Sequence, residues 1–143
     1  LYTKETISPY IESARAGFEL IEDRGSDYSR LSAMALIIDV GWNWGSLLAP
    51  VNPDWRKLDI GNLKGTVSFD GEEVASGNSG DVLGHCVNSL AWVANRLADH
   101  GKILKKGMIV STGSMVACQF IPVGTTAVGR IEGLGEVTVR YEF

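Results

Sequence analysis

The sequence predicts an α+β fold, a mixed and mostly antiparallel β-roll around one long packed helix. The dipeptide Asp70-Gly71 lies between two segments of alternating apolar and polar residues, which is typical of a tight hairpin because glycine adopts the positive φ of the turn. Apolar residues recur at helical spacing between positions 81 and 98. Short predicted strands with glycine-containing turns between them fill the C-terminal third.

The first half of the chain predicts two helices and two strands. A hydroxyl at Thr6, followed by a proline in the first turn, predicts a helix over residues 6–16. A strand is expected at residues 18–22, on which Glu19 and Phe18 lie on opposite faces. Further along we expect a loop, a short helix, a strand and an irregular connection, at residues 23–29, 31–40, 42–48 and 50–59.

The second half predicts a hairpin, the long helix and four more strands. The hairpin strands are residues 65–69 and 73–76. The helix opens near residues 78–81 and ends before Gly101. Its buried stripe is expected to consist of Leu83, Val87, Leu90, Ala94 and Leu97. The remaining strands are expected at residues 108–111, 116–121, 126–131 and 136–141.

Length and composition are those of a single packed domain. The chain has 143 residues, of which 45% are hydrophobic and 21% charged. Its net charge of -4 and the lack of a Lys/Arg-rich run argue against a nucleic-acid or anionic-membrane partner. No apolar run is long enough to span a bilayer, and no basic start precedes an apolar core, so we expect no membrane segment and no secretory signal.

Cys86 and Cys118 are the only cysteines. The first falls on the predicted long helix and the second in a predicted apolar strand, so we expect two reduced, buried thiols and a cytoplasmic protein. The first residue is Leu1, which suggests a processed product, a fragment or an incomplete record of a longer chain. The four tryptophans are expected in the core or at an interface: Trp42, Trp44, Trp55 and Trp92.

Four places carry side chains that suit chemistry, and each has a structural alternative. Glu19, among apolar neighbours, must be solvated, paired with a residue such as Arg24, or bound to a cation. Asp39 is either a structural acceptor or a functional carboxylate. His85 is either a packed helix-start residue or an acid/base. Residues 112–114 form either a hydroxyl turn or a corner that presents O–H and N–H donors to an anion.

Residues 81–98, 101–107 and 110–114 together resemble the C-terminal half of the fumarylacetoacetase-like superfamily. The resemblance is to its 2-keto-4-pentenoate hydratase and 4-oxalocrotonate decarboxylase branch, and it extends from residue 7 to residue 143. It implies the C-terminal core of the fumarylacetoacetase-like fold. Residues 1–143 would then be one domain, the C-terminal part of a catalytic domain.

The resemblance also implies a metal ligand. The family segment Ala-Leu-Glu-Ile-Val-Asp-Asp-Arg aligns with residues 17–24, which read GFELIEDR. In the family this glutamate, here Glu19, is the third ligand of a divalent metal, Mg²⁺ or Mn²⁺. The other two ligands form a Glu-x-Glu motif upstream, with a lysine further upstream, and this chain contains neither.

Two further matches imply catalytic residues, and a third implies a substrate contact. Asp39 matches the aspartate of Leu-Ile-Ala-Asp-Asn, although Val40 replaces the asparagine. His85 matches the histidine of Leu-Gly-His-Pro, although Cys86 replaces the proline. In the family, the corner that corresponds to Thr112, Gly113 and Ser114 contacts the carboxylate end of the substrate.

The activity that the resemblance implies is a metal-dependent hydro-lyase of aromatic compound catabolism. It would act on a small 2-oxo or 2-hydroxy-dienoic acid through a metal-stabilised enolate. A decarboxylase or C–C hydrolase of the same superfamily, and a catalytically degenerate partner subunit, are the alternatives. Because the Glu-x-Glu motif is absent, we expect a missing N-terminal portion or companion chain and a homo- or hetero-oligomer.

Overall fold

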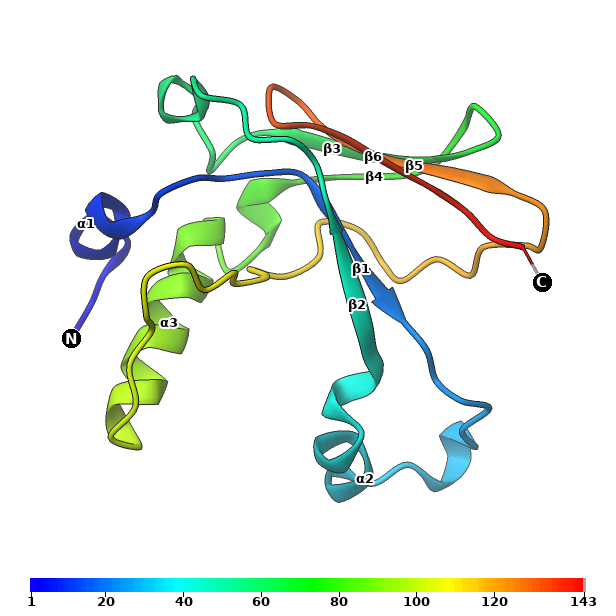
Figure 1. The fold of residues 1–143 in the computed structure, drawn as a ribbon, viewed down its shortest axis with the longest axis horizontal. Coiled ribbons are helices and arrows are strands. Elements are labelled where there is room, and N and C mark those ends of the chain that lie inside the picture. Colours follow the sequence, from blue (N-terminus) through cyan, green and yellow to red (C-terminus); the bar gives the residue numbers. More distant parts are fainter. Residues whose placement is uncertain (143) are drawn as a thin grey trace.

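The structure, a computed structural model, describes residues 1–142 and contains two antiparallel sheets (Figure 1). The larger has four strands in the order β4-β3-β5-β6, with bounds β3 Lys64–Phe69, β4 Glu72–Asn78, β5 Thr126–Ile131 and β6 Gly135–Arg140. The smaller is a ribbon of β1 Gly17–Ile21 and β2 Asn43–Leu48. The α-helices are α1 Lys4–Ile7, α2 Ala33–Ile38 and α3 Cys86–Asp99. Single 3₁₀ turns lie at Ser8–Tyr10, Tyr28–Arg30, Val40–Trp42, Trp55–Lys57 and Ser79–Asp81.

The predicted hairpin is confirmed at the turn between β3 and β4. Asp70 and Gly71 both have positive φ, at 48° and 91°. The Asp70 carboxylate also accepts a hydrogen bond of 2.9 Å from the backbone N–H of Thr126, the first residue of β5. The turn therefore holds the next strand of the sheet as well as its own two strands.

The ribbon packs across the large sheet, and this contact forms the main core. Where the two meet, a Cβ on Gly129 of β5 would lie 2.6 Å from the ring of Phe18 on β1, so only glycine admits the aromatic ring there. The buried residues of this core are Ala16, Ala49, Trp55, Leu63, Leu134 and Val137. Beyond the sheet the ribbon runs outward and carries α2 at its far end (Figure 1).

A second core lies between α1 and α3. Ile7 of α1 is buried against Val87, Ala91 and Ala94, which recur at helical spacing on α3. The Asn95 side chain closes the contact, because it accepts a hydrogen bond from the backbone N–H of Tyr2 at 2.7 Å and donates to the backbone carbonyl of the same residue at 2.9 Å.

The helix predicted over residues 6–16 is wrong. Thr3 caps the helix instead, so α1 starts earlier, and the chain is extended from Ile11. The reason is tertiary: the Trp55 indole donates to the carbonyl of Glu12 at 3.2 Å, and the Arg56 guanidinium donates to the carbonyl of Ile11. These two contacts use carbonyls that a helix would have needed for its own hydrogen bonds.

The predicted start of the long helix is also wrong. Leu83 and Gly84 both have positive φ, at 51° and 74°, which breaks the chain direction before the helix. The helix begins at Cys86 with His85 as its N-cap. Leu83 therefore lies outside the buried stripe, and it is 64% exposed.

The strands predicted at residues 108–111 and 116–121 are wrong, because the structure has neither helix nor strand between residues 102 and 125. The segment lies over the β3–β4 hairpin instead of beside it. Gly65 and Gly77 are paired across the hairpin, and a Cβ on either would meet Met115, at 2.7 Å from its Cε and 1.8 Å from its carbonyl oxygen respectively. A segment that lies across paired strands cannot add a strand to their edge.

Both cysteines are free, and only Cys86 is partly buried. Cys118 is exposed and lies in the segment without strands, so its predicted burial in a strand is wrong. Of the tryptophans, Trp55 is in the core, whereas Trp44 and Trp92 are exposed. Among the described residues, no helix has the length and apolar character needed to cross a membrane.

Candidate functional site

Glu19 lies at the middle of β1 on the exposed face of the ribbon. Its neighbours Phe18 and Leu20 are half-buried on the other face, as predicted. One carboxylate oxygen, Oε1, accepts a hydrogen bond of 2.8 Å from the Asn43 side-chain amide. Arg24, which the sequence suggested as a partner for Glu19, pairs with Asp39 instead.

Asp39 caps the C-terminus of α2, and its carboxylate forms an ion pair with Arg24. Its backbone is also engaged, since its N–H donates to the carbonyl of Ala35 at 3.0 Å and its carbonyl accepts from the N–H of Trp42 at 2.8 Å. Both contacts hold the connection between α2 and the ribbon. These contacts support the structural interpretation of Asp39, and a catalytic role stays a prediction.

Three consecutive residues with positive φ follow Asp39. They are Val40, Gly41 and Trp42, at 51°, 61° and 62°. A β-branched residue in this region is a genuine conformational outlier. This turn leads directly into β2, whose first residue is Asn43. The turn therefore links Asp39 to the residue that donates a hydrogen bond to Glu19.

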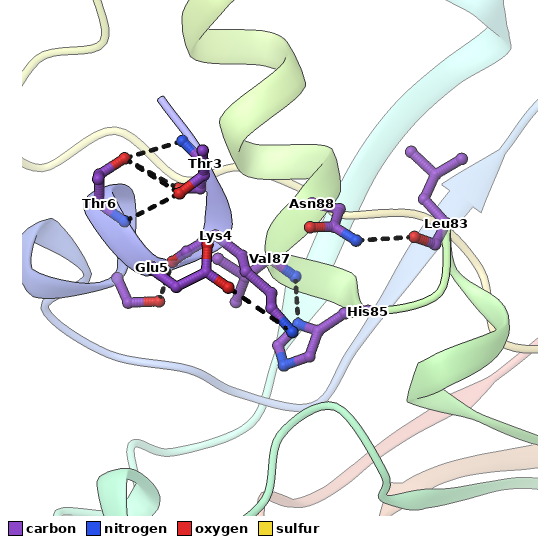
Figure 2. A network of polar contacts seen from close by, with 9 residues as sticks. Thr3, Lys4, Glu5, Thr6, Leu83, His85, Val87 and Asn88 are labelled. Carbon is purple, nitrogen blue, oxygen red and sulfur yellow. Dashed lines mark hydrogen bonds and ion pairs between the residues drawn. The ribbon is translucent and has the colours of Figure 1, made fainter. Parts of the chain in front are cut away.

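His85 begins α3 beside the first turn of the chain (Figure 2). Its Nδ1 accepts a hydrogen bond of 3.1 Å from the backbone N–H of Val87, so a neutral imidazole carries its proton on Nε2. A Cβ on Gly61 would lie 2.3 Å from the Cδ2 of His85, which shows how closely the ring packs on that loop. His85 is therefore a cap and a packed residue, with Nε2 as the nitrogen that can donate.

Two groups next to His85 set its surroundings. The pKa of the Glu5 carboxyl on α1 is lowered, chiefly by a hydrogen bond from Thr3, with smaller charge effects of Lys4 and His85. Figure 2 shows the ion pair of Glu5 with Lys4 beside the His85 ring. Burial raises the pKa of the Cys86 thiol, whose S–H donates to the carbonyl of Ile60 at 3.2 Å. A neutral, bonded thiol is not a nucleophile.

The corner at residues 112–114 packs on the loop that precedes α3. Gly113 has φ of 123°, and a Cβ there would lie 2.9 Å from Val82. The Ser114 hydroxyl donates to the carbonyl of Val116 at 2.5 Å and accepts from its N–H at 3.3 Å, so it stabilises its own turn. Within residues 1–142 the Thr112 hydroxyl forms no hydrogen bond, which leaves it able to bind a ligand.

The candidate residues therefore fall into two groups. His85 and the corner meet at Val82, because the N–H of His85 donates to the carbonyl of Val82 at 3.0 Å. Glu19 and Asp39 lie on the ribbon and on the turn that leads into it. In the part of the chain that the structure describes, no hydrogen bond or ion pair joins one group to the other.

The described residues do not complete a metal site. No group of three or more His, Cys, Asp or Glu side chains between residues 1 and 142 could hold a metal ion. Glu19 fits a single ligand position, because it is an exposed carboxylate and a hard cation prefers oxygen. Asn43, its hydrogen-bond donor, was missed from the sequence, since the contact depends on a strand irregularity that the sequence does not reveal.

The hollows on the outer face of the large sheet are separate from these groups. The larger has a volume of about 390 Å³, and Arg130 and Glu136 in its lining form an ion pair of 2.6 Å. None of the candidate residues lines it. The hollow lies over paired strands with satisfied charges, and it offers no group for chemistry.

Comparisons with known proteins relate the chain to enzymes of one branch. No family model matches it. A 2-keto-4-pentenoate hydratase of Paraburkholderia phymatum is 34% identical over 86 residues, which cover 60% of this chain and 33% of the relative. A 4-oxalocrotonate decarboxylase of Pseudomonas putida is 33% identical over 84 residues, 59% of this chain and 32% of the relative. A 2-hydroxyhexa-2,4-dienoate hydratase of Comamonas testosteroni is 24% identical over 139 residues, 97% of this chain and 52% of the relative.

Solved structures give the same likeness. The 4-oxalocrotonate decarboxylase from Pseudomonas putida G7, complexed with magnesium and adipate, superimposes with a TM-score of 0.79 and 25% identity over 87% of this chain and 47% of that chain. The complex of the same enzyme with calcium and acetate gives 0.76 and 26%, over 87% and 46%. The predicted fold is thus confirmed. The chain spans about a third to a half of the length of these relatives.

Proposed function

We propose that this chain forms part of a metal-dependent hydratase-like lyase. The premise is its relation to the C-terminal portion of the 2-keto-4-pentenoate hydratase and 4-oxalocrotonate decarboxylase branch. The substrate would be a small 2-oxo or 2-hydroxy-dienoic acid. The observation that carries the proposal is the match to hydratases and decarboxylases in sequence, and to a magnesium complex in structure. Residues 1–143 would be the C-terminal part of its catalytic domain.

The metal is the first part of the proposed chemistry. A divalent cation, Mg²⁺ or Mn²⁺, supplies Lewis-acid stabilisation of an enolate when it is bound. Glu19 would contribute one carboxylate oxygen to it. No described cation neutralises Glu19, because Arg24 is paired with Asp39. Asp39 would then act through the turn that it holds beside Glu19.

The second group would handle the substrate. The Thr112 hydroxyl and the N–H groups of the Gly113 corner would bind the carboxylate end of the acid, as donors around an anion do. His85 would hold a proton at Nε2, since its Nδ1 is occupied by the N–H of Val87. That proton is the one that His85 can deliver to the substrate.

The remaining ligands would come from outside these 143 residues. We propose that a preceding segment or a companion chain carries the Glu-x-Glu pair and the lysine, and that the active form is a homo- or hetero-oligomer. Large apolar side chains exposed on the ribbon and α2 support this proposal, because surfaces of this kind mark contacts with other polypeptides. They are Ile21, Met34, Ile37, Ile38 and Trp44.

Two alternatives are kept because specific observations favour them. A decarboxylase of the same superfamily is favoured by two solved structures that the chain resembles, both of a 4-oxalocrotonate decarboxylase. A catalytically degenerate partner subunit is favoured by Val40 and Cys86, which replace polar or rigid residues of the family.

The first experiment combines native and intact mass with denaturing separation, which shows whether a second polypeptide co-purifies. The same material is then assayed with Mg²⁺ and either a 2-hydroxy-dienoate or a 2-oxo diacid whose second carboxylate can leave as CO₂. Loss of the diene absorbance without CO₂ identifies a hydratase, and release of CO₂ identifies a decarboxylase. Glu19→Gln should abolish either activity, whereas Glu72→Gln, an exposed carboxylate of the hairpin, should not. Absence of any reaction, with and without the second chain, would leave the degenerate subunit as the better account.

A further inference from the structure

A β-bulge in the ribbon brings Asn43 onto the same face as Glu19. Glu19 pairs with Ser46 and Leu20 with Gly45, but Ile21 then pairs with Asn43, so that Trp44 is the extra residue. In a regular ladder Trp44 would face Ile21, and Asn43 would lie on the opposite face. Bulges commonly redirect a side chain in this way.

The redirected amide reaches the carboxylate from the diagonal position of the ladder. Its Nδ2 lies 2.8 Å from Oε1 of Glu19, which is within the distance of a good hydrogen bond. In the described chain this is the only side-chain hydrogen bond to Glu19, and no ion pair reaches it. The contact therefore engages one oxygen and leaves Oε2 without a partner.

The donor to Glu19 is the neutral amide of Asn43, so it does not cancel the charge of the carboxylate. An arginine or lysine at this position would compete with a metal for the charge of the carboxylate, whereas an amide orients the group and keeps its full negative charge. Arg24, the cation that the sequence suggested as a partner for Glu19, is held by Asp39. The ribbon thus presents an oriented and unneutralised carboxylate.

We infer that Asn43 is a positioning residue for Glu19: the bulge at Trp44 aims its amide at Oε1, which fixes the carboxylate and leaves Oε2 for a divalent cation. The purpose of this arrangement rests on the proposed function, but the positioning itself is a property of the metal-free chain. The two are tested separately.

The positioning is tested by NMR on the metal-free 143-residue chain, as the order of the Glu19 side chain from ¹³C relaxation. Asn43→Ala and the nearly isosteric Asn43→Asp both remove the amide donor, and Glu19 should become mobile in both. Ser46→Ala is the matched control, because Ser46 faces Glu19 directly and forms no described hydrogen bond with it. Asn43→Gln, which keeps the amide, should restore part of the order.

A second measurement keeps Asn43 unchanged and therefore does not depend on the stability of the Asn43 variants. Glu19→Gln should shift the side-chain NH₂ signals of Asn43, because a carboxylate and an amide oxygen polarise the donor differently. If Glu19 is equally mobile in wild type, Asn43→Ala and Ser46→Ala, or if the Asn43 signals ignore Glu19→Gln, the inference is overturned.

The purpose is tested with Mn²⁺ on the chain together with the segment or companion that carries the remaining ligands, through paramagnetic broadening of the Asn43 and Glu19 signals. Substoichiometric Mn²⁺ should broaden both signals in wild type, and the effect should disappear in Glu19→Gln and weaken about tenfold in Asn43→Ala. Broadening that is equal in wild type and Glu19→Gln overturns the metal role of Glu19 and leaves the positioning result standing. Broadening that depends on Glu19 but is unchanged in Asn43→Ala overturns the role of Asn43.

Discussion

At the scale of single residues, Val40 is placed where its side chain is least suited. It has φ of 51° and is 74% exposed, so it bears the cost of a left-handed backbone while burying little apolar surface. The family pattern has asparagine here, a residue that tolerates this region because its short side chain bonds locally. The substitution that weakens the resemblance therefore also strains the turn after Asp39.

Val40→Asn should raise the stability of the chain. Removal of a β-branched side chain from the left-handed region is expected to increase the free energy of unfolding by about 1 kcal/mol, since that strain is roughly 1–2 kcal/mol per residue. Urea denaturation measures it as a higher midpoint at an unchanged m-value. Val123→Asn, at an exposed valine without positive φ, is the control and should stay within about 0.5 kcal/mol of wild type. Equal midpoints for the two variants would contradict the strain.

Tyr28 and Asp23 form a pair whose pKa values move in opposite directions. The Tyr28 hydroxyl donates to the Asp23 carboxylate at 2.5 Å, and this bond lowers the pKa of Asp23 and raises that of Tyr28. The stability that Asp23 contributes is present above its unfolded pKa and is lost as the pH falls through the lowered folded value. The contribution of Tyr28 is present below its unfolded pKa and is lost as the pH rises through the raised folded value.

Tyr28→Phe should therefore return the Asp23 pKa upward toward its ordinary value. An NMR titration of the Asp23 side-chain carboxyl carbon measures the shift, and absorbance of the tyrosinate in wild type measures the raised phenol. Tyr10→Phe, at an exposed tyrosine with no described hydrogen bond from its hydroxyl, is the control and should leave Asp23 unchanged. An Asp23 titration that is the same in Tyr28→Phe and wild type would show that the bond does not persist in solution.

At the scale of elements, the sequence predicts best the features that depend on neighbouring residues alone. The hairpin at Asp70 and the ribbon strands follow from turn chemistry and side-chain period, and the structure confirms them. The predicted apolar stripe of the long helix is confirmed at Val87 and Ala94, but Leu83 lies outside the helix. The start of α3 was misplaced because Leu83 is apolar at helical spacing, although its backbone is left-handed. The apolar run at residues 116–121 predicted a strand, but pairing needs a partner edge, which no local pattern provides.

In the candidate site, too, the residues could be identified from the sequence, whereas the contacts between them depend on the fold. The resemblance identified Glu19, Asp39, His85 and the 112–114 corner, and the structure shows that each lies at an element boundary or on an exposed face. Asn43 was not predicted, because its role depends on a bulge that moves it across the ribbon. The pairing of Arg24 with Asp39 in place of Glu19 likewise depends on the fold of the α2 loop.

His85→Asn should separate the capping role from an acid/base role. Asparagine is a good N-cap, so this variant should keep the stability of α3, whereas His85→Ala should lose about 1 kcal/mol. Chemical denaturation measures both. If His85 also transfers a proton, the assembled enzyme should lose activity in His85→Asn while its melting is unchanged. Full activity in this variant would restrict His85 to the cap.

Gly129→Ala tests the crossing of the ribbon and the sheet. A methyl group there would lie 2.6 Å from the Phe18 ring, so the variant should lose about 1–3 kcal/mol of stability through overpacking. Phe18→Leu in the same chain should restore part of the loss, because it removes the clashing ring. Gly45→Ala is the control, since nothing lies within 4 Å of the added Cβ. If both alanine variants melt alike, β1 does not pack on β5 as described.

At the scale of the whole molecule, the ribbon carries apolar surface away from both cores. Figure 1 shows α2 at the far end of the ribbon, separated from the sheet and from α3. Ile37 and Ile38 on this helix are 72% and 74% exposed, and Met34 is 63% exposed. A helix with so much apolar surface is stabilised by packing against a partner and not by its own six residues.

We therefore predict that the purified chain associates through α2, with itself or with the companion proposed above. Native mass should show more than one polypeptide, and the double variant Ile37→Glu, Ile38→Lys should shift the mass to that of a single chain. A matched double variant in residues 102–125, Ile109→Glu with Phe120→Lys, tests whether the effect is specific to α2, because those side chains are also 70% and 79% exposed. Loss of association only in the first variant would place the contact on α2. Wild-type material that is a single chain at all concentrations would contradict the prediction, since the apolar side chains of α2 would then be tolerated in water.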